Sequence, residues 1–108
     1  MTNIDTKTFK TNQDEAFAFI TSVLRTNPSY EDGQYYFHFT ADENDITAFN
    51  NYRDAEVTVT TAISVEDMCD EAGIEHDADI GDILANFEET ARFDEIVKEI
   101  YDEVIEKI

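Results

Sequence analysis

The segment from residue 66 to residue 83, EDMCDEAGIEHDADIGDI, concentrates acidic side chains and contains no lysine or arginine. Carboxylates held this close together repel one another, and bound cations would relieve that repulsion. The chemistry that this segment could do is therefore the binding of cations, which could be a metal ion or the basic side chains of another protein. The eight carboxylates of the segment are Glu66, Asp67, Asp70, Glu71, Glu75, Asp77, Asp79 and Asp82.

A calcium-binding loop is the first possibility, because the EF-hand pattern places acidic residues at its first, third and twelfth positions. Asp77, Asp79 and Glu88 fit these positions. Gly81, however, stands at the fifth position, where a side-chain ligand is needed, and Asp82 stands at the sixth, where the sharp turn needs glycine. We therefore expect no specific metal site and no cofactor in this segment, only weak and nonspecific binding of divalent cations.

The other reactive side chains do not form a recognisable catalytic set. Cys69 is the only cysteine and falls on the apolar side of a short predicted helix, which is typical of a buried structural thiol. His38 lies in a predicted strand and His76 lies among acids, and neither has a cysteine or a second histidine at the spacing of metal ligands. Three glycines do not supply a phosphate-binding loop. We therefore expect that the protein is not an enzyme.

A second set of carboxylates recurs at steps of three and four residues near the end of the sequence, opposite an apolar stripe. On a helix this spacing forms a continuous ridge. One helical turn rises about 5.4 Å, and each strand of B-DNA carries roughly one phosphate per 3.4 Å of axis, so one or two carboxylates per turn approach the charge density of DNA. The segment from residue 66 could supply a second row. The ridge contains Glu95, Glu99, Asp102, Glu103 and Glu106, and Lys98 and Lys107 only partly interrupt it.

Apolar spacing predicts three helices that would position these acids. The first begins at a capping box at Ser64, runs for about two turns and ends at Gly73. The second has Asp77 or Asp79 as its N-cap, and a break in the spacing predicts a bend near Thr90 before the third and clearest helix. The apolar positions are Val65, Met68, Cys69 and Ala72, then Ile80, Ile83, Leu84 and Phe87, and finally Phe93, Ile96, Val97, Ile100, Val104, Ile105 and Ile108.

The N-terminal part of the sequence predicts one helix after a possible short strand. The strand would lie in IDTKTFK, residues 4–10. TNQD, residues 11–14, is a variant of the capping box, and four apolar residues follow it at helical spacing. We therefore predict a helix from about Asn12 to Arg25, which ends before Pro28.

Two segments alternate apolar and polar residues and predict half-buried strands. They are QYYFHFTA, residues 34–41, and AEVTVTTAI, residues 55–63. The pair Asp32-Gly33 favours a tight turn that joins the first of them to a short partner strand around residues 29 and 30. Residues 40–53 open with a capping box and fit either a short helix or a long loop.

These elements predict an α+β fold that forms a single domain over residues 1–108. It would have a small, mostly antiparallel β-sheet, an N-terminal helix and a helical, highly acidic C-terminal half. A chain of 108 residues, of which 42% are hydrophobic, is long enough for one domain with a core and too short for two.

Charge and segment composition limit the partners and the compartment. The net charge is −19, of which residues 1–63 carry −6 and residues 64–108 carry −13, so binding to DNA or to anionic lipid is disfavoured. The start of the sequence is polar and unlike a signal peptide, and the longest apolar run, AFAFI, is too short to cross a membrane. With a single cysteine and no internal disulfide, we expect a soluble, cytoplasmic protein.

The stretch DADIGDILANFEE, residues 77–89, is weakly similar to the segment of acyl carrier proteins that holds their prosthetic group. That similarity would imply a serine to which phosphopantetheine is attached. No serine lies between Asp77 and Leu84, so we do not expect a carrier function.

The size, the acidity and the rows of carboxylates over the whole chain resemble those of DNA-mimic proteins, in particular the small anti-CRISPR and anti-restriction inhibitors of phages. This resemblance implies an inhibitor that occupies the DNA-binding channel of a CRISPR effector or a restriction nuclease, with carboxylates in place of phosphates. The partner would be a basic nucleic-acid-binding protein or complex, contacted by the thirteen carboxylates named above. Direct binding of nucleic acid or membrane is not expected.

Three other functions would also explain the acidic composition of this sequence. An immunity protein or antitoxin would block the basic active site of a nuclease toxin with the same acids. An acidic adaptor subunit would instead use the aromatic strand face that carries Tyr36 and His38. A solvated surface adapted to a salt-rich cell would bind nothing, but the absence of lysine and arginine from residues 66–91 argues against it, because a surface that serves only solubility gains from mixed charge.

Overall fold

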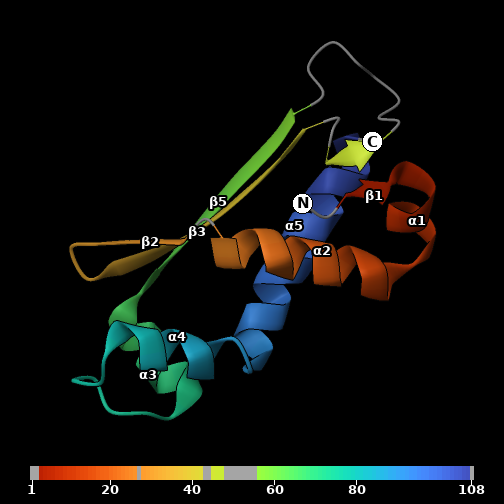
Figure 1. Cartoon of the computed structure of the whole chain (residues 1–108). Coiled ribbons are helices and arrows are strands. Elements are labelled where there is room, and N and C mark those ends of the chain that lie inside the picture. Colours follow the sequence, from red (N-terminus) through yellow and green to blue (C-terminus); the bar gives the residue numbers. More distant parts are fainter. Residues whose placement is uncertain (1–2, 27, 43–44, 48–55, 108) are drawn as a thin grey trace.

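The computed structural model describes residues 3–26, 28–42, 45–47 and 56–107. It confirms the predicted α+β class, with helices packed on one face of a three-stranded antiparallel sheet (Figure 1). The elements are β1 (Ile4–Asp5), α1 (Thr6–Thr11), α2 (Gln13–Thr26), β2 (Pro28–Glu31), β3 (Gln34–Asp42), β4 (Ile46–Thr47), β5 (Glu56–Ser64), α3 (Val65–Ala72), α4 (Ile80–Phe87) and α5 (Ala91–Lys107).

The main sheet has the strand order β2-β3-β5, and both outer strands run antiparallel to β3. The turn between β2 and β3 consists of Asp32 and Gly33, whose φ angles are 52° and 77°. Two successive positive φ angles are the geometry that an Asp-Gly pair favours in a two-residue hairpin. β3 and β5 pair along all nine residues of each strand. The predicted hairpin and both predicted long strands are therefore confirmed.

The sheet has an inner face in the core and an outer face toward solvent. α2 packs against β3 and α5 against β5, on the same side of the sheet (Figure 1). The predicted alternation along both strands is confirmed, because the inner positions are more buried than the outer ones. Buried inner residues are Tyr35, Phe37, Phe39, Ala41, Val57 and Ile63, whereas Thr40, Thr58, Thr60 and Ala62 are exposed on the outer face.

A cluster of three phenylalanine rings fixes the end of α4 and the start of α5 against the sheet. Phe37 of β3 lies 5.8 Å from Phe87 and 5.7 Å from Phe93 between ring centroids. Phe87 and Phe93 are 6.1 Å apart and nearly perpendicular, a favourable arrangement for aromatic pairs. All three rings are at most 3% exposed. The packing of this cluster therefore positions the acidic C-terminal half.

The N-terminal prediction is wrong in part. The strand predicted within residues 4–10 is limited to β1, and the chain continues as the unpredicted helix α1. Asp5 starts this helix, since its Oδ1 accepts a hydrogen bond from the Thr8 amide at 2.6 Å. The cap of α2 is confirmed with a shift of one residue, because Asn12 Oδ1 accepts from the Glu15 amide at 3.2 Å.

The segment of residues 40–53 differs from both of its predicted forms where the structure describes it. Thr40 lies in β3 opposite Thr58 and therefore does not cap a helix. Ile46 is fully buried in β4, which pairs in parallel with β1. The rest of the segment, including Phe49, lies outside the described residues.

Both predicted ends of α3 are confirmed. Ser64, the last residue of β5, is also the N-cap of α3, and its Oγ accepts a hydrogen bond from the Asp67 amide at 3.0 Å. Gly73 ends the helix in the left-handed conformation, with φ 69° and ψ 34°, which glycine adopts without steric cost. The short helix therefore follows the strand directly, so β5 positions the acids of α3.

Replacing Ser64 with alanine is expected to lower the free energy of unfolding by about 1 kcal/mol, because the Asp67 amide loses its acceptor. Urea denaturation followed by circular dichroism measures this change. Ser64→Thr keeps a hydroxyl acceptor at the cap and is expected to retain most of the stability. Equal losses in the two variants would contradict a capping role for this residue.

The remaining helices follow the predicted boundaries closely. Asp79 occupies the N-cap position of α4, although its side chain makes no capping hydrogen bond. The bend predicted near Thr90 is confirmed, and Thr90 Oγ1 accepts a hydrogen bond from the Phe93 amide at 3.3 Å as α5 begins. None of the described helices is long and apolar enough to cross a membrane. The buried stripe of α5 contains Phe93, Ile96, Val97, Ile100 and Val104, while Ile108 lies outside the described residues.

Candidate protein-binding surface

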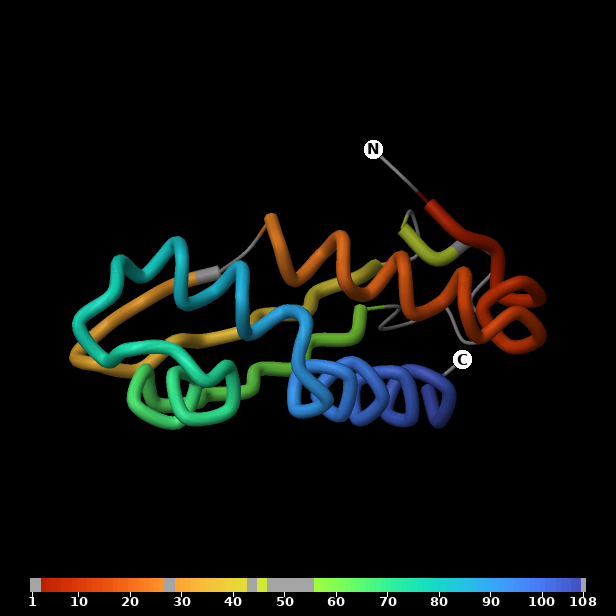
Figure 2. The backbone as a smooth tube through the Cα atoms, turned by 90° about the horizontal axis from the view of Figure 1, so that it is seen from below, coloured from red at the N-terminus to blue at the C-terminus, as the bar shows by residue number. Residues whose placement is uncertain are grey.

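All thirteen predicted contact carboxylates are exposed. α3 and α5 carry nine of them, and Figure 2 shows these two helices one after the other along the same side of the molecule. The other four, Glu75, Asp77, Asp79 and Asp82, lie in the connection after α3 and in the first turn of α4. We call the carboxylates of α3 and α5 the two acidic rows; they are Glu66, Asp67, Asp70 and Glu71, and Glu95, Glu99, Asp102, Glu103 and Glu106.

The acidic row of α5 forms a single stripe. With 3.6 residues per turn, its five carboxylates fall within an arc of about 100° and span about 17 Å along the helix axis from Glu95 to Glu106. Their mean axial separation of about 4 Å is close to the roughly 3.4 Å per phosphate of one DNA strand. The row therefore approaches the linear charge density of one phosphate strand, as the sequence pattern predicts.

Few of these carboxylates are neutralised by basic side chains that the structure describes. Among the described residues, only three of the thirteen have an ion-pair partner within 4 Å. Exposed pairs of this kind are worth about 0–1 kcal/mol and open readily when another cation competes. The three pairs are His76 Nε2 with Asp70 Oδ1 at 2.9 Å, Arg92 with Glu95 Oε2 at 3.5 Å, and Lys98 Nζ with Asp102 Oδ2 at 3.1 Å.

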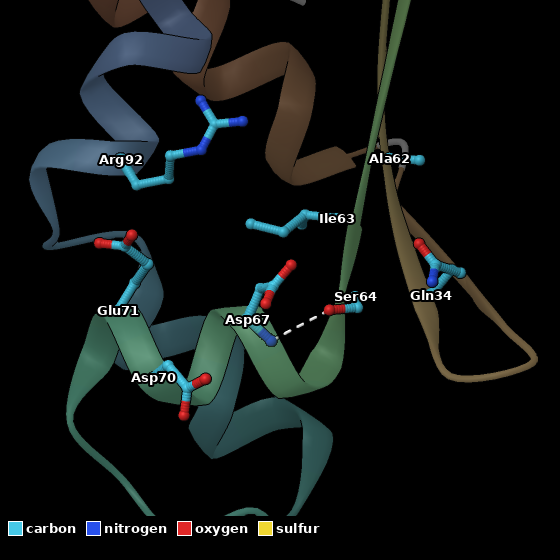
Figure 3. A pocket seen from close by; sticks show the side chains of 8 residues that line it. All are labelled: Gln34, Ala62, Ile63, Ser64, Asp67, Asp70, Glu71 and Arg92. Atoms are coloured by element: carbon cyan, nitrogen blue, oxygen red, sulfur yellow. Dashed lines mark hydrogen bonds between the residues drawn. The ribbon is translucent and has the colours of Figure 1, made fainter.

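An open pocket of about 520 Å³ lies between the acidic row of α3 and the first turn of α5. Its walls come from β3, β5, α3 and Arg92 of α5. Figure 3 shows Arg92 on one side, with the carboxylates of Asp67 and Glu71 on the facing side. Arg92 is the only lysine or arginine between residues 54 and 97. This basic residue therefore lines the pocket together with acids of α3 and forms an ion pair with Glu95, the first acid of the α5 row.

The spacing of the acids did not indicate Arg92 as part of this surface. A signal was present, because a lone arginine in a long acidic segment usually has a local carboxylate partner. The proximity of α3 to the start of α5 could not be read from the same pattern, since it depends on the packing of both helices against the sheet.

The other candidate reactive side chains, Cys69 and His38, make contacts that are typical of structural residues. Cys69 is fully buried, which confirms the predicted structural thiol, and burial raises the pKa of this thiol above its ordinary value. On the outer sheet face, His38 forms hydrogen bonds with Ser29 at 2.9 Å and Thr60 at 3.2 Å, and its ring stacks on Tyr36. In the described part of the chain, no group of three or more His, Cys, Asp or Glu side chains is placed to hold a metal ion.

His76 and Asp70 form a pH-sensitive contact within the acidic surface. The hydrogen bond from His76 to the Asp70 carboxylate raises the pKa of His76 above its ordinary value, and the negative charges of Asp70 and Glu66 act in the same direction. The folded-state pKa thus exceeds the unfolded-state pKa. The contact therefore stabilises the fold fully below the unfolded-state pKa, and this contribution is lost as the pH rises through the folded-state pKa.

Replacing Asp70 with asparagine is expected to lower the pKa of His76, because the hydrogen bond loses its charged acceptor. An NMR titration of the His76 ring protons measures this pKa. Asp77→Asn removes a carboxylate next to His76 in sequence and is the matched control, with a smaller expected change. An unchanged His76 pKa in Asp70→Asn would contradict the contact.

Comparison with protein-family models, with curated proteins and with solved structures finds no match to this chain.

Proposed function

We propose that this protein is a DNA mimic that inhibits a nucleic-acid-binding defence complex, a CRISPR effector or a restriction nuclease, by occupying its DNA-binding channel. The observation that carries the proposal is the pair of consecutive acidic rows on α3 and α5: the row of α5 has a spacing close to that of phosphates, and few of these acids have an ion-pair partner among the described residues. The protein would act in the cytoplasm as a stoichiometric inhibitor, without catalysis and without a cofactor.

Electrostatics supports this function in two ways. A DNA-binding channel presents lysine and arginine side chains that neutralise phosphates, and carboxylates at similar spacing can replace those phosphates. The net charge of −19 also stores self-repulsion that a cationic channel would relieve. Association is therefore expected to be fast, through long-range attraction, and to weaken as salt rises.

The anchoring of helices α3 and α5 in the core also supports the proposed inhibitory function. The acidic row of α5 lies opposite the buried positions Ile96, Ile100 and Val104, each 0% exposed, and α3 is anchored by Met68 and Cys69, also 0% exposed. The backbone of each row is thus fixed before binding. Binding then costs little conformational entropy, because only the carboxylate side chains have to be ordered.

The elongated shape of the molecule is compatible with binding in a channel. Its principal extents are 45, 25 and 23 Å. A length of 45 Å corresponds to about 13 base pairs of B-DNA, at roughly 3.4 Å per pair. An immunity protein or antitoxin that blocks the active site of a nuclease toxin would use the same acids, and it is the second candidate function.

Affinity capture at two salt concentrations tests the proposal. The tagged protein is used to capture partners from a lysate at about 50 mM salt and again at about 500 mM salt, where screening is much stronger, and the partners are identified by mass spectrometry. We expect a basic nucleic-acid-binding protein that is depleted at high salt. A CRISPR effector or restriction nuclease supports the DNA mimic, and a nuclease toxin supports the second candidate. Capture of no such protein would contradict both functions.

A further inference from the structure

His76 is held against α3 by the connection that follows this helix. The Ile74 amide donates to the Cys69 carbonyl at 3.1 Å, and the Cys69 thiol donates to the Glu75 carbonyl, with 3.6 Å between sulfur and oxygen. Because Cys69 is fully buried in α3, these bonds fix the chain immediately before His76. The His76 ring reaches back to the helix, where its Nε2 lies 2.9 Å from Asp70 Oδ1. One carboxylate of the α3 row therefore has a basic partner from its own chain.

Asp70 also lines the open pocket between α3 and Arg92 (Figure 3). A partner's cation in this pocket would lie close to the carboxylate that accepts the hydrogen bond from His76. The side chains of His76 and Asp70 are 54% and 63% exposed, so a partner can reach the contact. His76 and a partner's cation would therefore compete for the same carboxylate.

The elements next to His76, which are α3, its connection and α4, carry acids and no lysine or arginine. The hydrogen bond to Asp70 is the main cause of the raised pKa of His76, and the charges of Asp70 and Glu66 add to it. Arg92 of α5 lines the same pocket as Asp70. The acids of these three elements are Glu66, Asp67, Asp70, Glu71, Glu75, Asp77, Asp79 and Asp82. When it is protonated, His76 is therefore the one cation that these elements supply to their own acids.

We propose that His76 is a pH-dependent switch for the acidic row of α3, in which the protonated ring holds Asp70 and weakens the binding of a basic partner. This role rests on the proposed function, in which the row binds cations of a partner. The protonated ring and Asp70 together carry no net charge, whereas with the neutral ring they carry one negative charge. A partner's cation repels the protonated ring, so binding favours release of its proton. Affinity therefore rises as the pH rises through the pKa of His76 in the free protein.

The direction of this pH dependence distinguishes the switch from titration of the partner. A basic partner loses positive charge as the pH rises, because its histidines and later its lysines deprotonate, and its binding would weaken. The switch acts in the opposite direction. A peptide of about ten lysines with blocked ends is a suitable probe, because lysine has an ordinary pKa of about 10.4 and remains charged up to about pH 8.5.

Calorimetric titration of the whole protein with this peptide, at about pH 6.0 and about pH 8.5 and at the same salt concentration, tests the switch. The affinity is expected to be at least about threefold higher at the higher pH. His76→Gln keeps a side-chain donor for Asp70 but does not titrate, so its affinity should be nearly the same at both pH values. His38→Gln is the matched control, because His38 is the only other histidine and lies in β3. This control should keep the full rise in affinity.

An NMR titration of the His76 ring protons gives a second measurement. The pKa of His76 is expected to fall when the peptide is bound, because the peptide's cations repel the protonated ring. An unchanged pKa, an affinity that does not rise with pH, or an equal rise in His76→Gln would overturn the switch and leave the proposed function untouched. A peptide that binds at neither pH would contradict both, since the acidic rows would then not bind cations.

Discussion

Reversing two charges on α5, with Glu99→Lys and Glu103→Lys together, is expected to weaken binding of a basic partner by at least about 100-fold. Both residues are exposed, lie one turn apart and have no ion-pair partner among the described residues. Loss of a close charge pair in an interface costs about 1.5–7 kcal/mol, and each 1.4 kcal/mol is about tenfold in affinity. Lysine favours helices as strongly as glutamate does, so α5 should remain intact.

A control with the same change in net charge separates a specific contact from general attraction. Glu31→Lys with Glu56→Lys changes the charge by the same amount on exposed strand residues of the sheet. We expect this variant to bind within about tenfold of the original protein, mainly through slower association. Calorimetric titration against the captured partner measures both affinities. Equal losses in the two double variants would contradict a specific role for the acidic rows.

Replacing Phe37 with alanine is expected to lower the free energy of unfolding by about 3–5 kcal/mol. The substitution removes a ring that is 2% exposed and that contacts Phe87, Phe93 and Tyr35. A domain of this size has a total stability of about 5–15 kcal/mol, so the loss is a large fraction of it. Because the same ring holds the end of α4 and the start of α5, partner binding should weaken as well.

The neighbouring aromatic residue is the matched control for this substitution. Tyr36 is half-buried on the outer face, where its ring stacks on His38. Tyr36→Ala is expected to cost less than half of the loss seen with Phe37→Ala, because the core keeps its packing. Urea denaturation of both variants gives the comparison. Equal losses would show that the phenylalanine cluster is not the centre of the core.

Local signals in the sequence account for most of the fold that could be predicted. The alternation in β3 and β5, the Asp32-Gly33 turn and the cap at Ser64 each depend on neighbouring residues only. The α1 helix was missed, although Asp5 caps it, because a helix of six residues shows too little periodicity. The parallel pairing of β1 with β4 joins residues about forty positions apart in the sequence, and no local pattern indicates it.

In the candidate binding surface, too, some features follow from local sequence patterns and others depend on tertiary packing. Helical spacing predicts exposure for the nine acids of α3 and α5, which lie away from the apolar stripes, and the structure confirms it. The position of Arg92 in one pocket with acids of α3 could not be predicted, since it depends on the packing of Phe87 and Phe93 on Phe37. The contact between His76 and Asp70 likewise depends on how the chain turns back after Gly73.

Competition with DNA tests the central claim most directly. A fluorescent DNA duplex is bound to the captured effector complex or nuclease, and this protein is added in increasing amounts while fluorescence anisotropy reports the bound DNA. A DNA mimic is expected to displace the duplex at one molecule per channel, and the variant with Glu99→Lys and Glu103→Lys is expected to leave the DNA bound. Simultaneous binding of the protein and the DNA to the same complex would contradict the claim.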